Sequence, residues 1–163
     1  MKVVSNTSPL VNLAVIGQLP LLQRIYPKIL IPPTVHNELI CFPPIQTAIA
    51  QQVDAGALKL QTPRNSALVQ TLSQALDPGE AAAIALATEL RAERLLIDER
   101  AGRRVSKQYG LNIRGIVGIL VNAKQQGLIL ATKPLLDRLI QEAGFRMSPT
   151  LYESALKAAN ELN

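Results

Sequence analysis

Short apolar runs alternate with longer helical patterns along the chain, starting with Val3-Val4 close to the N-terminus. β-Branched residues such as these suit a pleated, buried strand. Further short strands are expected at 29–31, 58–61, 94–97 and 112–113. Because a helical pattern lies between most of them, the order predicts parallel strands joined by right-handed crossovers.

Helix signals fill the stretches between these strands. In the first of them Ser8 is a candidate cap, with Pro9 at the first helical position. The last predicted helix has the same arrangement, with Ser148 as cap before Pro149. Helices are predicted at 9–16, 19–26, 33–40, 45–53, 65–76, 77–87, 102–110 and 115–126, with two more from 133 onward.

Composition favours an α/β fold with helices layered on a central parallel sheet of four to five short strands. The 163 residues are 48% hydrophobic, yet only 3% are aromatic, so the core is built from Leu, Ile, Val and Ala. This length predicts one domain, 1–163, with 145–163 as a helical tail docked on the body. In that tail an apolar stripe runs through Leu151, Tyr152, Ala155, Leu156, Ala159 and Leu162.

Cysteine use and hydropathy bear on the compartment. The single cysteine, Cys41, excludes an internal disulfide framework and fits a reducing compartment. No signal peptide is recognised, and no run approaches the roughly 18 apolar residues of a membrane span. We therefore expect a soluble, cytoplasmic protein.

Oxygen-bearing side chains stand where two of the predicted strands end. Asn6 and Asp98 follow apolar strands, and Glu80 lies in the first turn of the helix before the second of these strands. If the two strands are neighbours, the side chains at their tips converge, and Glu38 and Glu99 complete the group. Clustered carboxylates stay ionised only beside a cation, and oxygen ligands favour Mg²⁺ or Mn²⁺ over zinc. Such a centre can hydrolyse phosphodiesters.

Each acid also has a purely structural interpretation, which the sequence leaves open. Asp77 and Glu80 have the spacing of a capping box. Asp98 can cap the helix that follows it. Glu38 and Glu99 can be solvated surface acids.

Basic residues gather beside Asp98 and contribute to a net charge of +5. Phosphate binding by a polynucleotide requires such groups, and arginine binds phosphate in bidentate fashion. The alternative is a solvated helix face paired with Glu89, Glu93 and Glu99. The basic residues are Arg91, Arg94, Arg100, Arg103, Arg104, Lys107 and Arg114.

Four segments together resemble the PIN-domain branch of unknown function that is related to VapC-type toxin ribonucleases. They are Val3–Leu10, Ile31–Pro33 followed by Glu38-Leu39, Asp77–Ala87 and Leu96–Arg104. The resemblance implies a PIN-like three-layer sandwich, a Mg²⁺ or Mn²⁺ site and cleavage of RNA. It places catalytic acids at Glu38, Glu80 and Asp98 and metal ligands at Asn6, Glu80 and Asp98, with Thr7 and Ser8 at the hydroxyl positions that flank the first ligand. From the residues themselves we add Glu99 as a metal ligand, and we infer RNA-binding roles for Thr7, Ser8, Arg100, Arg103 and Arg104.

Asn6 departs from the family pattern, which has aspartate at this position. Asparagine keeps one carbonyl oxygen but removes a negative charge, which weakens attraction for a cation. Two functions follow: a metal-dependent endoribonuclease, with the toxin of a toxin–antitoxin pair as its expected role, or an inactive PIN-fold module that binds RNA or protein. Expected partners are RNA, an antitoxin protein and a second copy in a homodimer. A phosphoacceptor receiver domain fits less well, since no lysine follows a late strand at the expected place. A dinucleotide-binding enzyme fits less well still, since the first strand is followed by Asn-Thr-Ser-Pro and not by a glycine-rich turn.

Overall fold

A computed structural model describes residues 1–162 of the chain. In this part the chain forms ten α-helices, one short 3₁₀ helix and five strands. The first half contains β1 (Val3–Ser5), α1 (Thr7–Val15), α2 (Leu19–Ile25), β2 (Ile29–Ile31), α3 (Pro33–Ile40), η1 (Pro43–Ile45), α4 (Gln46–Asp54), β3 (Leu58–Leu60) and α5 (Ser66–Leu72). The second half contains α6 (Pro78–Leu90), β4 (Arg94–Leu96), α7 (Arg100–Gln108), β5 (Ile113–Arg114), α8 (Ile116–Gln125), α9 (Lys133–Glu142) and α10 (Pro149–Ala158).

The strands form one parallel sheet in the order β3-β2-β1-β4-β5, with β1 in the middle. Val4 of β1 is paired with Leu30 on one side and with Leu95 on the other. The predicted α/β fold with a parallel sheet is therefore confirmed. Because β1 and β4 are neighbours, their carboxyl ends meet at the same edge of the sheet, which places Asn6 and Asp98 close to one another.

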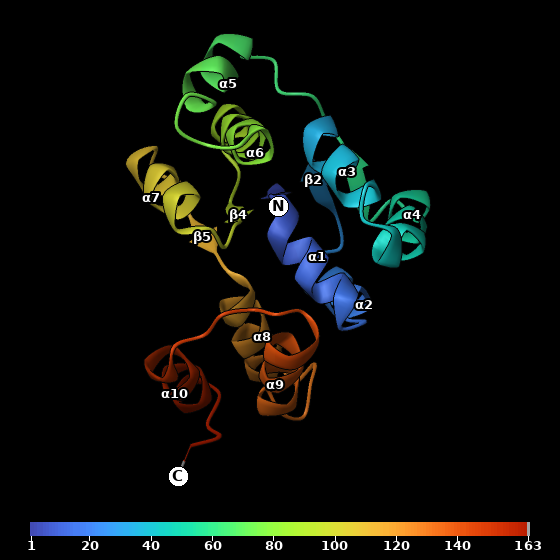
Figure 1. Cartoon of the computed structure of the whole chain (residues 1–163), viewed down its shortest axis with the longest axis vertical. Helices are drawn as coiled ribbons and strands as arrows, with labels where there is room; N and C mark the ends of the chain where they lie inside the picture. The colour runs from blue at the N-terminus through green and yellow to red at the C-terminus, as the bar shows by residue number, and fades with distance from the viewer. Residues whose placement is uncertain (163) are drawn as a thin grey trace.

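Alternate residues of the strands supply two apolar layers. Val3 packs in a cluster with α1, α2, α4 and α8, whereas Val4 packs in a second cluster with α5 and α6. Figure 1 shows α5, α6 and α7 on one side of the strands and α1 and α2 on the other. Helix α6 is buried throughout 79–87, and its alanines allow it to lie against β1, β4 and α3. This is the predicted three-layer sandwich.

The first helix begins earlier than predicted. α1 starts at Thr7, its cap position is Asn6, and the Asn6 side chain makes no capping bond. The assignment of Ser8 as the cap is wrong, because Ser8 lies inside the first turn. Pro9 is tolerated there because backbone N–H groups in the first turn have no partner within the helix.

Other helix boundaries also differ from the sequence prediction, and α6 for example ends at Leu90, three residues later than predicted. α7 begins at Arg100, two residues before the predicted start at Gly102. α5 ends at Leu72, and residues 73–76 form a turn that leads to the Asp77 cap of α6. Boundaries of this kind depend on the packing of neighbouring elements more than on local propensity.

The C-terminal helix α10 packs on α8. Ser148 caps α10 by accepting the N–H of Leu151 at 3.1 Å. Ala155, Leu156 and Ala159 are buried, and α10 contacts α8. Leu151 and Leu162 do not join that buried stripe, because they are 42% and 40% exposed. The predicted tail extends to residue 163, which lies outside the described residues.

Candidate metal centre

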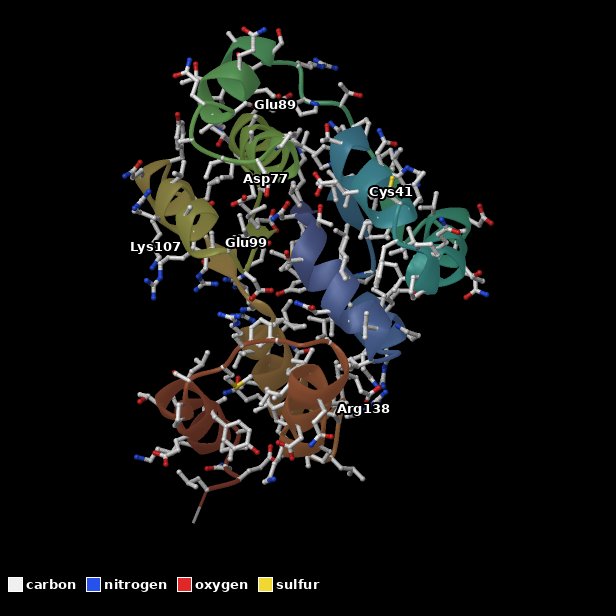
Figure 2. The ribbon with its side chains drawn as sticks, viewed as in Figure 1. Cys41, Asp77, Glu89, Glu99, Lys107 and Arg138 are labelled. Carbon is white, nitrogen blue, oxygen red and sulfur yellow. The ribbon has the colours of Figure 1, made fainter. Side chains whose placement is uncertain are left out.

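Backbone hydrogen bonding between β1 and β4 continues for one residue beyond the carboxyl end of β1. The backbone N–H of Asn6 donates to the carbonyl of Leu96 at 2.9 Å, which holds Asn6 beside the end of β4. Its side chain is 2% exposed. Figure 2 shows Glu99 between α7 and α1, and Asp77 at the start of α6 on the same side of the molecule. These elements surround the candidate centre.

Glu99 connects three parts of this centre. Its Oε2 accepts the side-chain N–H of Asn6 at 3.1 Å, and its Oε1 accepts the hydroxyl of Ser8. The negative charge of Glu99 also raises the pKa of both Glu80 and Asp98, which places all of these groups in one electrostatic neighbourhood. Glu99 is therefore not a solvated surface acid.

Glu38 reaches the centre from α3. Its Oε2 accepts the hydroxyl of Thr7 at 2.7 Å. Its other oxygen lies against the first turn of α6, where a Cβ added to Gly79 would be only 2.3 Å from Oε1. The N-terminal end of a helix favours negative charge, so this placement stabilises the Glu38 carboxylate. Thr7 and Ser8 thus both donate to acids of the centre.

One carboxylate oxygen of Asp98 makes a structural hydrogen bond. Its Oδ1 accepts the N–H of Ile116, the first residue of α8, at 2.9 Å. It does not cap α7, which has Glu99 at its cap position. Its Oδ2 is buried and has no hydrogen-bond partner among the described residues. Asp98 therefore fixes the start of α8 and keeps a second oxygen available.

Glu80 forms only half of the capping box suggested by its spacing from Asp77. The Asp77 side chain caps α6 by accepting the N–H of Glu80 at 2.8 Å. Within the described residues Glu80 makes no return bond, and its Oε2 is buried without a partner. The Oε2 atom faces α7, because it would lie 2.5 Å from a Cβ on Gly102 of that helix.

Burial perturbs both of these acids. It raises the pKa of Glu80 to about 8, and the neighbouring Asp77 and Glu99 carboxylates add to the effect. Burial also raises the pKa of Asp98 to about 6, although the N–H of Ile116 and the guanidinium of Arg103 oppose the shift. At neutral pH Glu80 is thus mostly protonated, and ionising the whole centre requires a positive charge to compensate.

Three glycines, which sequence reasoning missed as part of the centre, make room for its acids. A Cβ on Gly79, Gly102 or Gly115 would come within 2.6 Å of an oxygen of Glu38, Glu80 or Asp98, respectively. Gly102 carried the clearest signal, because glycine inside a helix is unfavourable and indicates a close approach.

The donor set matches a hard divalent cation. Three buried side-chain oxygens in the centre lack a hydrogen-bond partner among residues 1–162: Asn6 Oδ1, Glu80 Oε2 and Asp98 Oδ2. Buried polar atoms are rarely left unpaired, and oxygens are the ligands that Mg²⁺ and Mn²⁺ prefer. No group of three or more His, Cys, Asp or Glu side chains in this part of the chain is arranged to hold a metal ion.

Comparison with known proteins identifies the family of the chain. A family model described as a PIN domain matches residues 2–161. The chain belongs to the PIN-domain family. No curated protein matches the chain. Family membership confirms the predicted resemblance and supports a nuclease-like fold, and PIN domains generally use divalent metals.

In this PIN domain the predicted arginines lie next to the centre. Arg100, Arg103 and Arg104 line a groove that also contains Asp98. Arg103 is held by a bond from its Nη1 to the carbonyl of Ile97 at 3.1 Å. No helix between residues 1 and 162 is long and apolar enough to cross a membrane.

The interpretation of these basic residues as a face paired with acids is wrong. Glu89 accepts the backbone N–H groups of Arg64 and Asn65, and Glu93 pairs with the N-terminal amine at 4.0 Å. Glu99 accepts from Asn6 and Ser8, as described above. The three acids proposed as partners are therefore engaged elsewhere.

Proposed function

We propose that this PIN-domain protein is an endoribonuclease that depends on Mg²⁺ or Mn²⁺. The observation that carries the proposal is the set of three buried, unpartnered oxygens on Asn6, Glu80 and Asp98. These three residues would hold the cation, with Glu99 beside them. The cation, when bound, supplies an acidified water and neutralises charge on the scissile phosphate.

The surrounding residues orient the donors. Glu99 takes the amide N–H of Asn6, which leaves the Asn6 oxygen for the centre. The Ile116 N–H fixes Asp98 through its other oxygen. Thr7 fixes Glu38 at the edge of the site, where the half-buried carboxylate is a candidate proton acceptor. The guanidinium of Arg103, which acts electrostatically on Asp98, would also attract the phosphate of the substrate.

Cleavage of single-stranded RNA during Mn²⁺ titration tests the proposal. We expect cleavage by the wild type that EDTA abolishes and that Asp98→Asn removes. Asparagine at position 98 keeps an oxygen for the Ile116 N–H, so a loss of activity would not reflect loss of that bond. If the wild type and Asn6→Asp both fail to cleave at saturating Mn²⁺, the proposal is wrong.

The second candidate is an inactive PIN-fold module that binds RNA or protein. Asn6 favours it, because an amide in the first ligand position attracts a cation less than a carboxylate does. RNA binding that is unchanged by EDTA, without turnover in Mn²⁺, would select this candidate.

The family resemblance extends the proposal to a cellular role. We propose that the protein acts on RNA in the cytoplasm, as a dimer, as the toxin of a pair that an antitoxin protein neutralises. The exposed thiol of Cys41 fits a reducing compartment. Induced expression in a bacterial host should arrest growth with the wild type and not with Asp98→Asn.

A further inference from the structure

A groove of about 1040 Å³ runs from Asp98 between α7, α8 and α10. Its cations come from segments far apart in sequence, including the C-terminal tail: Arg100, Arg103, Arg104, Lys107, Arg114 and Arg146. Among residues 1–162, Asp98 is the one acid that lines it. Figure 2 shows Lys107 projecting from the outer side of α7. The groove therefore has a strong positive charge that is continuous with the candidate metal centre.

Most of these cations lack a protein partner. The four ion pairs found within residues 1–162 involve the N-terminal amine, Lys124, Lys133 and Arg138, and none of these groups lines the groove. Arg103 alone among the six groove cations has a side-chain hydrogen bond in this part of the chain. Uncompensated like charges repel each other, so such a cluster indicates an anionic ligand.

The remaining lining points to the kind of anion. Phe145, which is half-buried, is the one aromatic side chain of the groove, and Val117, Val121 and Ala155 form apolar surface near it. Cations beside an aromatic ring suit a single-stranded nucleic acid. Its phosphates bind the cations, and an unstacked base packs on the ring. A second copy of the chain is a poor occupant, since a two-fold contact would bring two positive grooves together.

We propose that this groove holds a single-stranded polynucleotide next to the cleavage site, with the C-terminal helix α10 as its outer wall and Phe145 as a base-stacking platform. The proposal rests on the proposed ribonuclease function and identifies where the substrate chain lies beyond the scissile phosphate. It gives a binding role to Lys107, Arg114, Arg146 and Phe145, which lie outside the acid centre.

The test measures binding of fluorescein-labelled decauridylate by anisotropy in EDTA, with no metal present. Six phosphate contacts predict a slope of log affinity against log salt of about −4, or roughly 300-fold weaker binding at 200 mM than at 50 mM salt. The double variant Arg104→Glu/Lys107→Glu should bind at least about 10-fold more weakly, with a slope shallower by about 1.4. Both side chains are exposed and make no side-chain hydrogen bond in the described residues, so the fold should persist.

Lys28→Glu/Lys59→Glu is the matched control. It makes the same change of charge at two exposed residues outside the groove and should alter affinity less than about twofold. Phe145→Leu keeps an apolar side chain but removes the ring, and should weaken binding about fivefold or more. If the groove variants and the control variant lost affinity for decauridylate by the same factor, the proposal would be overturned.

Two further outcomes separate the alternatives. In one outcome decaglutamate binds as tightly as decauridylate, with Phe145→Leu changing the affinity for both ligands by the same factor. In that case the groove takes an acidic protein and the proposal is wrong. Binding through the groove without any cleavage in Mn²⁺ would support the groove and reject the ribonuclease. Cleavage with an unchanged KM in the double variant would support the ribonuclease and reject the groove.

Discussion

The side-chain nitrogen of Asn6 lies 3.1 Å from Oε2 of Glu99. Because the amide gives its N–H to Glu99, its oxygen is left on the other side, where it is buried without a partner among the described residues. This bond orients a neutral oxygen donor at the end of the central strand. A carboxylate at position 6 could not donate this hydrogen bond to Glu99. Aspartate at this position would therefore add a negative charge and at the same time remove the bond that orients the oxygen.

Asn6→Asp should therefore have opposite effects on metal affinity and on stability. The added charge should raise affinity for Mn²⁺ by at least about 10-fold. Without metal the variant should be less stable, because two carboxylates would face each other where Asn6 now donates to Glu99. Isothermal titration with Mn²⁺ and thermal unfolding in EDTA measure the two effects.

Asn6→Ala is the control for this exchange, since it removes the oxygen without adding charge and should weaken Mn²⁺ binding. Equal affinity in the wild type, Asn6→Asp and Asn6→Ala would show that position 6 is not a ligand.

The raised pKa of Glu80 should make the stability of the metal-free protein depend on pH. Burial raises its pKa from 4.5 to about 8, so the folded state binds the proton more tightly than the unfolded state. This contribution is complete below pH 4.5 and is lost as the pH rises to about 8. Glu80→Gln, which resembles the protonated acid, should be more stable than the wild type at pH 8 and similar to it at pH 5.

Urea unfolding in EDTA at both pH values measures this difference. Glu153→Gln removes an exposed acid and should change stability little at either pH. A Glu80→Gln variant no more stable than the wild type at pH 8 would contradict the burial of an ionisable Glu80.

Gly102→Ala tests the close approach of α7 to Glu80. A Cβ at this position would lie 2.5 Å from Glu80 Oε2 and 2.6 Å from Cδ1 of Ile97. We expect a loss of about 1–3 kcal/mol in stability, despite the better helix propensity of alanine, together with weaker Mn²⁺ binding. Thermal unfolding and Mn²⁺ titration provide both measurements.

Gly118→Ala in α8 is the matched control, because its nearest neighbour is the flexible Arg114 side chain at 3.2 Å. It should retain stability and Mn²⁺ affinity. Similar behaviour of the two variants would argue that Gly102 has no special role beside Glu80.

The sheet was predictable because each strand is a short buried run with its own boundaries. Ile29–Ile31 was predicted without error, and the parallel order followed from the helices between strands. The first helix start was not predictable in the same way. Ser8 has the local properties of a cap, but its hydroxyl instead donates to Glu99, 91 residues away in sequence.

The acids of the centre were predictable as a group, because they follow strand ends or open helices. Their individual contacts were not. Asp98 has the appearance of a cap for α7, yet it accepts the N–H that begins α8, a tertiary contact that depends on how the sheet edge meets that helix. The groove was hidden for the same reason, since Arg146 joins the arginines of α7 only when α10 packs on α8.

Electron paramagnetic resonance of Mn²⁺ at pH 8, with the wild type and Asp98→Asn compared at equal protein concentration, tests the central claim most directly. Unfolding curves would first establish that both proteins are folded. We predict one bound Mn²⁺ per wild-type chain and at least about 10-fold weaker binding in Asp98→Asn, because one ligand charge is lost. No bound Mn²⁺ in the wild type, or equal binding in the two proteins, would contradict a metal centre built on Asn6, Glu80 and Asp98.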